Sequence, residues 1–172
     1  DYVFSHDKDN MQIYRNIGCK NVYWLPSAAV NTKVHKKLGI PKKHDITFVG
    51  SMTYRRKNIL TALEKHFQIF TPNIWDNKEI NEVFNESKIV LNIHLSDLPN
   101  IETRIGEVLG SGSFLLTEEL SSQDLFADGE HLVQWHKGDI DDLIKQIQYY
   151  LFHEDERERI ATKGHHFARK HQ

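Results

Sequence analysis

The residues with the clearest potential for chemistry lie in the segment Asn100–Leu116, NIETRIGEVLGSGSFLL. A helix is expected to begin near Glu102 and Thr103, after a loop that follows the apolar run IVLNI. The unpaired N–H groups and the positive dipole end of such a helix start favour a phosphate, and a diphosphate suits this arrangement. Arg104 adds a guanidinium that can bind a phosphate through two hydrogen bonds. The alternative is an ion pair between Arg104 and Glu107, three residues further along.

Glu107 and the glycines after it form the second part of this segment. A carboxylate one turn beyond Arg104 can accept hydrogen bonds from two adjacent hydroxyls, as a nucleotide ribose presents them. The alternative, and the simpler interpretation, is that Glu107 is a solvated glutamate on the helix surface and binds no ribose. Gly110-Ser111-Gly112 is expected to end the helix and allows close approach of the backbone. This is not a dinucleotide-binding G-x-G-x-x-G motif, because it lacks the third glycine and follows a helix.

A second candidate lies at Gly50-Ser51, where the strand-like run ITFVG ends. The basic residues of YRRK, 54–57, follow and are expected to open the next helix with Arg56 among them. A small turn and a basic cluster at this edge of a sheet suit phosphate contact. The sequence equally allows a solvated basic cluster, although cations at a helix start oppose the macrodipole.

The pattern of apolar residues predicts the elements that position these candidates. Short β-type runs alternate with longer helical stretches, which predicts a Rossmann-like three-layer α/β/α fold with a mostly parallel sheet. Strands are expected at residues 2–5, 22–25, 46–50, 67–70, 89–93, 114–117 and 131–135. Helices are expected at residues 8–17, 33–38, 56–66, 77–87, 102–110, 123–126, 140–152 and 154–171. Ligands of such sheets bind at the carboxyl ends of the strands, where both candidates are expected.

Composition excludes several classes of protein. The 22 basic and 24 acidic residues leave a net charge of -2, which gives no general attraction to nucleic acid. No apolar run approaches the roughly 20 residues that span a bilayer, so no transmembrane segment is expected. The single cysteine favours a reducing compartment, and hence a cytoplasmic protein. No metal site is expected, because the chain lacks a His-Glu-x-x-His motif and an Asp-x-Asp cluster.

From Asp45 to its end, the chain resembles the glycosyltransferase group 1 domain of proteins similar to the spore maturation protein CgeB. The resemblance follows the family's order through ITFVGS with Tyr54 and Arg56, PNIETRIGEVLGSGSFLLTEE, DLFADGEHLVQW, DIDDLIKQIQYYL and DERERIATKGHHFARKH. Residues 1–30 resemble a crossover from an N-terminal domain, and residues 31–172 a nucleotide-sugar-binding domain. The chain begins at Asp1 rather than at Met, so we expect a fragment that lacks that N-terminal domain.

The resemblance implies the C-terminal half of a GT-B fold and a retaining, hexosyltransferase-like activity. Its substrate would be a nucleoside diphosphate-sugar, with no further cofactor, and its acceptor a glycan, a protein or a small molecule bound largely by the missing domain. The alternative is a degenerate, non-catalytic module that acts as a spore-surface or partner-binding protein.

The resemblance also implies roles for single residues. Arg56 and Arg104 would be catalytic, by stabilising the diphosphate as it leaves. Glu107 would be the second glutamate of the family's E-x7-E motif and hold the ribose, while Asn100 would occupy the place of the first. The donor-binding residues implied in this way are Gly50, Ser51, Asn100, Glu102, Thr103 and Glu107.

Overall fold

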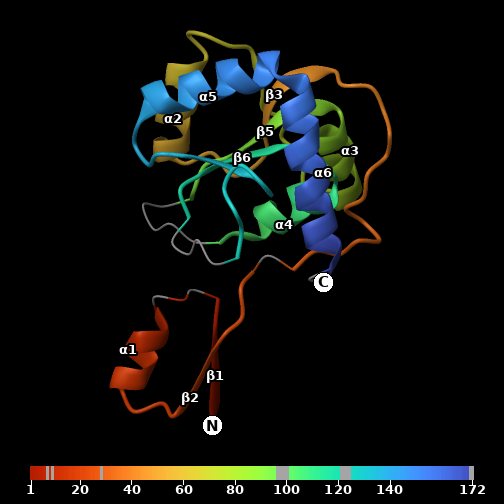
Figure 1. Cartoon of the computed structure of the whole chain (residues 1–172). Helices are drawn as coiled ribbons and strands as arrows, with labels where there is room; N and C mark the ends of the chain where they lie inside the picture. Colours follow the sequence, from red (N-terminus) through yellow and green to blue (C-terminus); the bar gives the residue numbers. More distant parts are fainter. Residues whose placement is uncertain (7, 9, 28, 96–100, 121–124, 171–172) are drawn as a thin grey trace.

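The computed structural model describes the chain except for residues 7, 9, 28, 96–100, 121–124 and 171–172 (Figure 1). The strands are β1 (Tyr2–Ser5), β2 (Asn21–Trp24), β3 (His44–Phe48), β4 (Ile69–Phe70), β5 (Ser87–Asn92), β6 (Leu115–Glu118) and β7 (Val133–Trp135). The helices are α1 (Asn10–Asn16), α2 (Tyr54–Leu63), α3 (Asn77–Asn85), α4 (Thr103–Gly110), α5 (Ile140–Phe152) and α6 (Glu154–Lys170).

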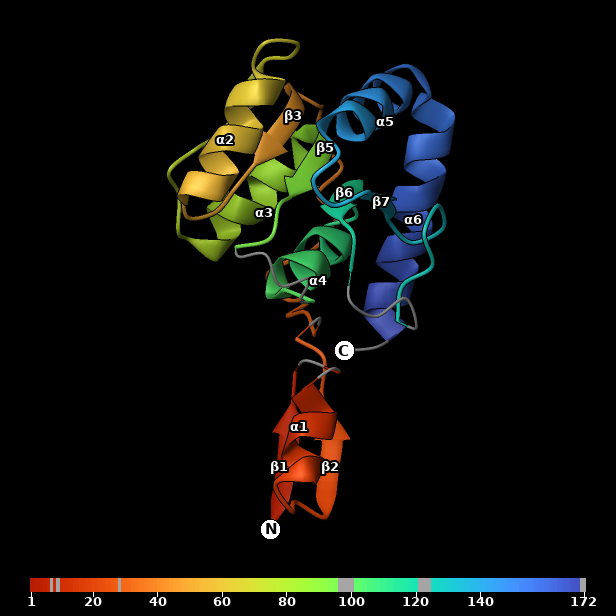
Figure 2. The same cartoon turned by 90° about the vertical axis from the view of Figure 1, so that its left-hand side faces the viewer.

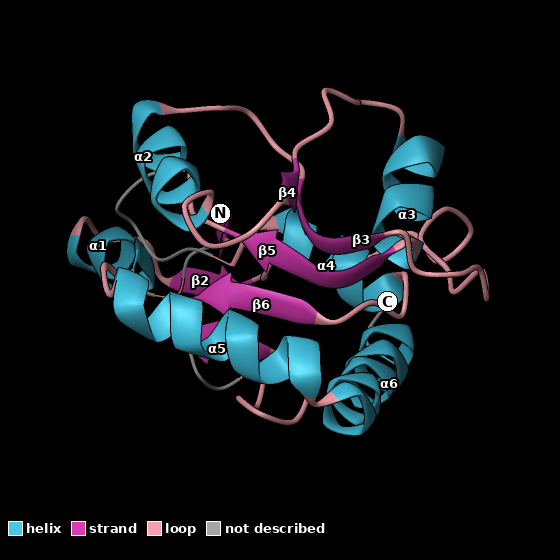
Figure 3. Cartoon of the chain, turned by 90° about the horizontal axis from the view of Figure 1, so that it is seen from above, coloured by secondary structure: helices cyan, strands magenta, loops and turns pink. Residues whose placement is uncertain are grey.

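Within the described residues, five of these strands form one parallel sheet in the order β4-β3-β5-β6-β7. Helices surround the central strands, as the view from above shows (Figure 3). Helices α2 and α5 contribute to one apolar cluster, α3 and α4 to another, and α6 to both. The predicted Rossmann-like α/β fold with a parallel sheet is therefore confirmed.

The alternation of side chains along β5 shows how the sequence builds both layers. Ile89 and Leu91 belong to the cluster beneath α2 and α5, while Val90 lies in the cluster beneath α3 and α4. Successive strand residues point to opposite faces, so a strand covered by helices on both sides must be apolar throughout. This is why the run IVLNI is buried along its whole length.

Strands β1 and β2 form a separate parallel pair near α1. Figures 1 and 2 show this pair beyond the end of α4, away from the five-stranded sheet. Residues 25–43 join the two parts, and a Cβ built on Gly110 would lie 2.5 Å from Val30 Cγ2. The connecting segment therefore packs closely on the last turn of α4.

The helix expected at residues 33–38 is wrong; the structure has a turn at residues 32–34 and no helix in this segment. The backbone N–H of Lys36 donates to Asn81 Oδ1 at 2.9 Å, and that of Leu38 to Asn85 Oδ1 at 2.8 Å. The side-chain amide of Asn85 donates in turn to the Lys36 carbonyl at 3.1 Å. Two side chains of α3 thus take up the backbone groups that a helix would pair internally.

The other differences between the predicted and the observed helices and strands are small. Helix α2 begins at Tyr54 rather than at Arg56, because the Thr53 hydroxyl accepts from the Arg56 N–H at 3.3 Å and caps the helix. The helix expected at 123–126 falls partly on residues outside the described part of the chain. No helix in the described residues has the length and apolar character needed to cross a membrane.

Candidate functional site

An open pocket of about 430 Å³ lies at the carboxyl ends of β3 and β5, beside the start of α4. The connecting segment and the loops after β3, β4 and β5 contribute its walls. Its lining residues are His6, Ser27, Val49, Gly50, Ser51, Arg56, Trp75, Asn92, Leu95, Ile101, Glu102, Thr103 and Arg104. The structure therefore brings the two sequence-predicted candidates together at one site.

Gly50 and Ser51 connect β3 to α2 and lie against the Arg56 side chain. A Cβ built on Gly50 would be 3.2 Å from Arg56 Nη1 and 3.4 Å from Phe48 Cζ. The Ser51 carbonyl accepts a hydrogen bond from Arg56 Nη1 at 3.1 Å. The absence of a side chain at position 50 thus leaves room for the guanidinium beneath the turn.

Arg56 is buried and anchored through each nitrogen of its guanidinium. Nε donates to the Ile93 carbonyl at 2.9 Å, and Nη2 lies 3.6 Å from Glu102 Oε2. The guanidinium also lies 5.3 Å from the Phe48 ring centroid. Burial lowers the pKa of Arg56 from its ordinary value, and the Glu102 carboxylate opposes this shift. The group is therefore a fixed positive charge in the pocket wall.

Glu102 is the N-cap residue of α4, but its side chain makes no cap hydrogen bond. Its Oε1 atom accepts from the Leu95 N–H at 3.0 Å and lies 3.7 Å from His94 Nδ1. Burial by itself raises the pKa of Glu102, but the His94 ring, the Leu95 N–H and Arg56 together lower it. The carboxylate is held away from the first N–H groups of α4, which have no partner within the helix.

Arg104 and Glu107 form the ion pair that the sequence left open as the alternative. Arg104 Nη1 lies 2.8 Å from Glu107 Oε2, and the guanidinium lies 5.3 Å from the Phe84 ring centroid. Burial lowers the pKa of Arg104, with Glu107 opposing the shift. Both arginines assigned to phosphate contact therefore have carboxylate partners, and these four side chains have no net formal charge when all are ionised.

The remaining predicted residues differ in their relation to the pocket. Gly50, Ser51, Arg56, Glu102, Thr103 and Arg104 line it, whereas Glu107 lies one turn further along α4. Asn100 lies outside the described residues. The spacing E-x7-E counted back from Glu107 ends at Pro99, so the sequence assignment to Asn100 is one residue off; neither residue has a carboxylate.

A buried charged network at the carboxyl ends of β5 and β6 was not predicted from the sequence. Glu118 is fully buried and pairs with Arg55, and its Oε2 atom accepts from the His94 N–H at 3.1 Å. His94 Nε2 lies 3.1 Å from the Glu119 carbonyl oxygen. The sequence did contain a signal for this network. His94 follows the apolar run IVLNI and Glu118 follows the apolar run FLLT, so each lies at the carboxyl end of a predicted strand. That is the edge at which open α/β sheets bind ligands.

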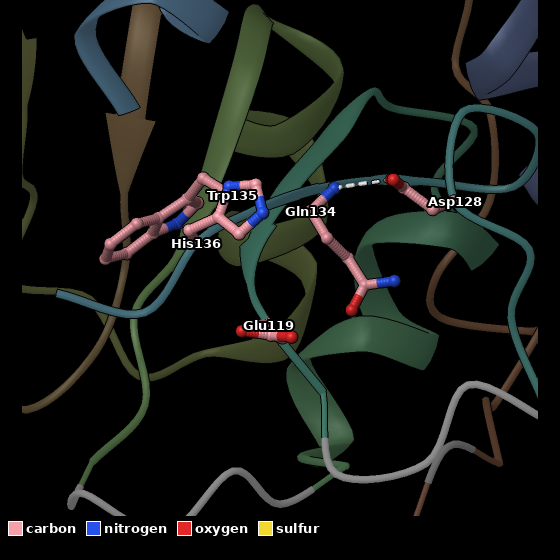
Figure 4. Close-up of a pocket in the computed structure, with 5 residues that line it drawn as sticks. All are labelled: Glu119, Asp128, Gln134, Trp135 and His136. Carbon is pink, nitrogen blue, oxygen red and sulfur yellow. Dashed lines mark hydrogen bonds between the residues drawn. The ribbon is translucent and has the colours of Figure 1, made fainter. Parts of the chain in front are cut away.

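A second, smaller pocket of about 110 Å³ lies near the end of β7, as Figure 4 shows. The Gln134 N–H donates to Asp128 Oδ1 at 2.8 Å, and the Gln134 side-chain oxygen accepts from the Leu120 N–H at 2.9 Å. A hydrogen bond to Asp142 raises the pKa of His136. Across the described part of the chain, no three His, Cys, Asp or Glu side chains form a group suited to a metal ion. The polar groups of this pocket mainly hold its own loops together.

Fold and site together define a Rossmann-like α/β domain that matches GT-B glycosyltransferase structures. Residues 41–172 match the glycosyl transferase-like family, and the chain belongs to that family. Among curated proteins, none matches the chain.

Three solved structures illustrate this likeness. Sucrose-phosphate synthase from Thermosynechococcus elongatus has 10% identity and a TM-score of 0.72, over 98% of this chain and 53% of that one. HepE from Anabaena, in complex with UDP-glucose, has 10% identity and a TM-score of 0.71, over 98% and 59%. The C-terminal domain of LpcC, a glycosyl transferase group 1 family protein from Francisella tularensis, has 15% identity and a TM-score of 0.63, over 83% and 97%. The chain thus spans little more than half the length of the first two.

Proposed function

We propose that the pocket binds a nucleoside diphosphate-sugar and that the chain is part of a retaining glycosyltransferase. One observation carries this proposal: Gly50-Ser51, Arg56 and the start of α4 with Arg104 line the same pocket. A helix start and two arginines together suit a diphosphate. The complex of HepE with UDP-glucose, on the same fold, supports this choice of ligand.

In this proposal, the donor replaces the carboxylate partners of both arginines. The diphosphate takes Arg56 from Glu102 and Arg104 from Glu107, and the freed Glu107 accepts hydrogen bonds from the ribose hydroxyls. Gly50 and Ser51 allow the backbone to approach the donor, and the backbone at Glu102 and Thr103 receives a phosphate at the start of α4.

Arg56 and Arg104 also have a role in the reaction itself. When the bond between the anomeric carbon and the diphosphate oxygen breaks, negative charge develops on the leaving diphosphate. The Arg56 guanidinium, which the Ile93 and Ser51 carbonyls hold in place, stabilises this charge without reorganising, and Arg104 and the helix start add to this effect.

We also propose that this chain is part of a longer protein with two domains. Residues 1–30 form the crossover from an N-terminal domain, residues 31–172 form the donor-binding domain, and the acceptor binds largely to the N-terminal domain. The enzyme is a cytoplasmic, CgeB-like hexosyltransferase associated with spores. The family match and the UDP-glucose complex of HepE favour an enzyme over a non-catalytic module.

Calorimetric titration of the chain with UDP, GDP and their sugars tests the donor site. We expect binding of at least one of these ligands, and about 10- to 150-fold weaker binding by Glu107→Ala, because hydrogen bonds to a charged group contribute about 1.5–3 kcal/mol. Asp155→Ala removes an exposed carboxylate on α6 and serves as the matched control. Equal affinities for wild type and Glu107→Ala, or no binding to either, would contradict the proposal.

A further inference from the structure

His94 lies buried beside Glu102, two residues after the end of β5. Its side chain is 1% exposed, and its Nε2 atom lies 3.1 Å from the Glu119 carbonyl oxygen. A carbonyl oxygen can only accept a hydrogen bond, so Nε2 carries the ring hydrogen. Nδ1 lies 3.7 Å from Glu102 Oε1 and has no hydrogen-bond partner among the described residues. The ring therefore directs an unused nitrogen towards a carboxylate.

The charged side chains around His94 occur in two ion pairs. The His94 N–H donates to Glu118 Oε2 at 3.1 Å, and the His94 carbonyl accepts from Arg55 Nη1 at 3.3 Å. Arg55 and Glu118 also pair with each other, away from the lining of the pocket. The second pair, Glu102 with Arg56, lines the pocket. Glu102 is thus the carboxylate near the ring whose partner an incoming anion can reach.

Donor binding, as proposed above, removes the Arg56 partner of Glu102. The carboxylate keeps the Leu95 N–H at 3.0 Å but loses the guanidinium. Burial disfavours the ionised carboxylate and by itself raises the pKa of Glu102. A proton on His94 Nδ1 supplies a new positive partner and allows a charge-assisted hydrogen bond to Oε1. A neutral ring would instead place a nitrogen lone pair against the carboxylate.

We propose that His94 is a positioning residue for Glu102 and takes up a proton when the donor binds. This inference rests on the proposed function, since the diphosphate of the donor is what draws Arg56 away from Glu102. The proton comes from solvent and adds to Nδ1, while Nε2 keeps its hydrogen on the Glu119 carbonyl. The imidazolium then holds the ionised Glu102 side chain away from the first N–H groups of α4, which stay open to phosphate.

Calorimetry in buffers of different ionisation enthalpy measures this proton directly. The ligands are UDP-glucose and GDP-mannose, because the terminal phosphate of UDP or GDP itself titrates at about pH 6. Between pH 5 and 8, histidine is the side chain whose charge ordinarily changes. We expect wild type to take up about half a proton or more per donor bound at pH 7. Its affinity should then rise about 3-fold or more per unit as the pH falls from 8 to 6.

Three variants identify where the proton goes. His94→Gln keeps a side-chain N–H for the Glu119 carbonyl but cannot titrate, so it should bind the donor without proton uptake and with an affinity that does not change with pH. Glu102→Gln removes the carboxylate that the proton serves, and it should also show no uptake. His66→Gln removes an exposed histidine beyond the end of α2, away from the pocket lining, and should behave as wild type.

The other outcomes contradict distinct parts of the proposal. Uptake that persists in His94→Gln places the proton on Glu102 itself, and uptake that persists in Glu102→Gln separates it from this pair; either result overturns the role of His94. Donor binding by wild type without uptake overturns it as well, while the donor site stands. If wild type binds neither ligand at any pH, the proposed function fails and this inference fails with it.

Nitrogen-15 NMR of the histidine rings gives a second readout that does not depend on the folding of His94→Gln. Donor addition should move the His94 Nδ1 signal of wild type from the unprotonated to the protonated position, and the same signal should not move in Glu102→Gln. A wild-type signal that stays unprotonated with donor bound would overturn the proposal.

Discussion

Arg104 and Glu107 lie side by side on one face of α4, with Nη1 2.8 Å from Oε2. Arg56 and Glu102 form a similar pair across the pocket, with Nη2 3.6 Å from Oε2. Both pairs place the groups proposed to bind phosphate next to carboxylates. Binding of an anionic ligand is therefore an exchange of partners, and this exchange can be measured.

Replacing Arg104 should weaken phosphate binding. Arg104→Ala removes one of two fixed positive charges, so we expect the affinity for UDP or GDP to fall about 10-fold or more. Arg104→Lys should show an intermediate affinity, because lysine keeps the charge but loses the planar, two-pronged geometry. Calorimetry at two salt concentrations measures the effect, and the salt dependence should be smallest for Arg104→Ala. Unchanged affinity in Arg104→Ala would remove this residue from the proposed site.

The contribution of Glu102 to stability should depend on pH in one direction. The pKa of Glu102 is lowered from its ordinary 4.5 in the folded protein, so the ionised carboxylate favours folding. This contribution is fully present above pH 4.5 and is lost as the pH falls through the lower folded pKa. The free energy of unfolding of wild type should exceed that of Glu102→Gln at neutral pH, and the difference should shrink in acid. Urea unfolding of both proteins at a series of pH values measures it; a difference that stays constant across the series contradicts the ion pair.

Asn85 should be important for stability because it ties the connecting segment to α3. Its side chain bonds the Leu38 N–H, the Lys36 carbonyl and the Asn81 carbonyl. Asn85→Ala leaves these backbone groups without their partner, so we expect a loss of about 2–4 kcal/mol in the free energy of unfolding. Asn77→Ala, an exposed position on the same helix, is the control and should change stability by less than about 0.5 kcal/mol. A loss in Asn85→Ala no larger than in the control would show that the segment is held by other contacts.

Much of the fold follows from local patterns. The runs IVLNI and FLLT predict buried strands, because a strand covered by helices on both faces has no polar side. The sequence predicts the helix after Glu102 to within a residue, and it allows the Arg104–Glu107 pair that the structure shows. The three-residue spacing brings these two side chains together on any helix.

The wrongly predicted helix at residues 33–38 and the missed charged network have a common cause. Both depend on contacts between residues that are distant in the sequence. Nothing in residues 33–38 indicates that Asn81 and Asn85 take up the backbone groups of this segment. The buried pair of Arg55 with Glu118 likewise joins two elements that the sequence keeps far apart.

The sequence by itself determined the alternation of strands and helices, the turn at Gly50-Ser51, the start of α4 and the three-residue spacing that allows Arg104 to reach Glu107. Only the tertiary structure decided that Glu102 is the partner of Arg56 and that Trp75 joins the same pocket. The physical reason is the order of the parallel strands. It brings the loops after β4, β3 and β5 side by side, although a helix separates each strand from the next along the chain.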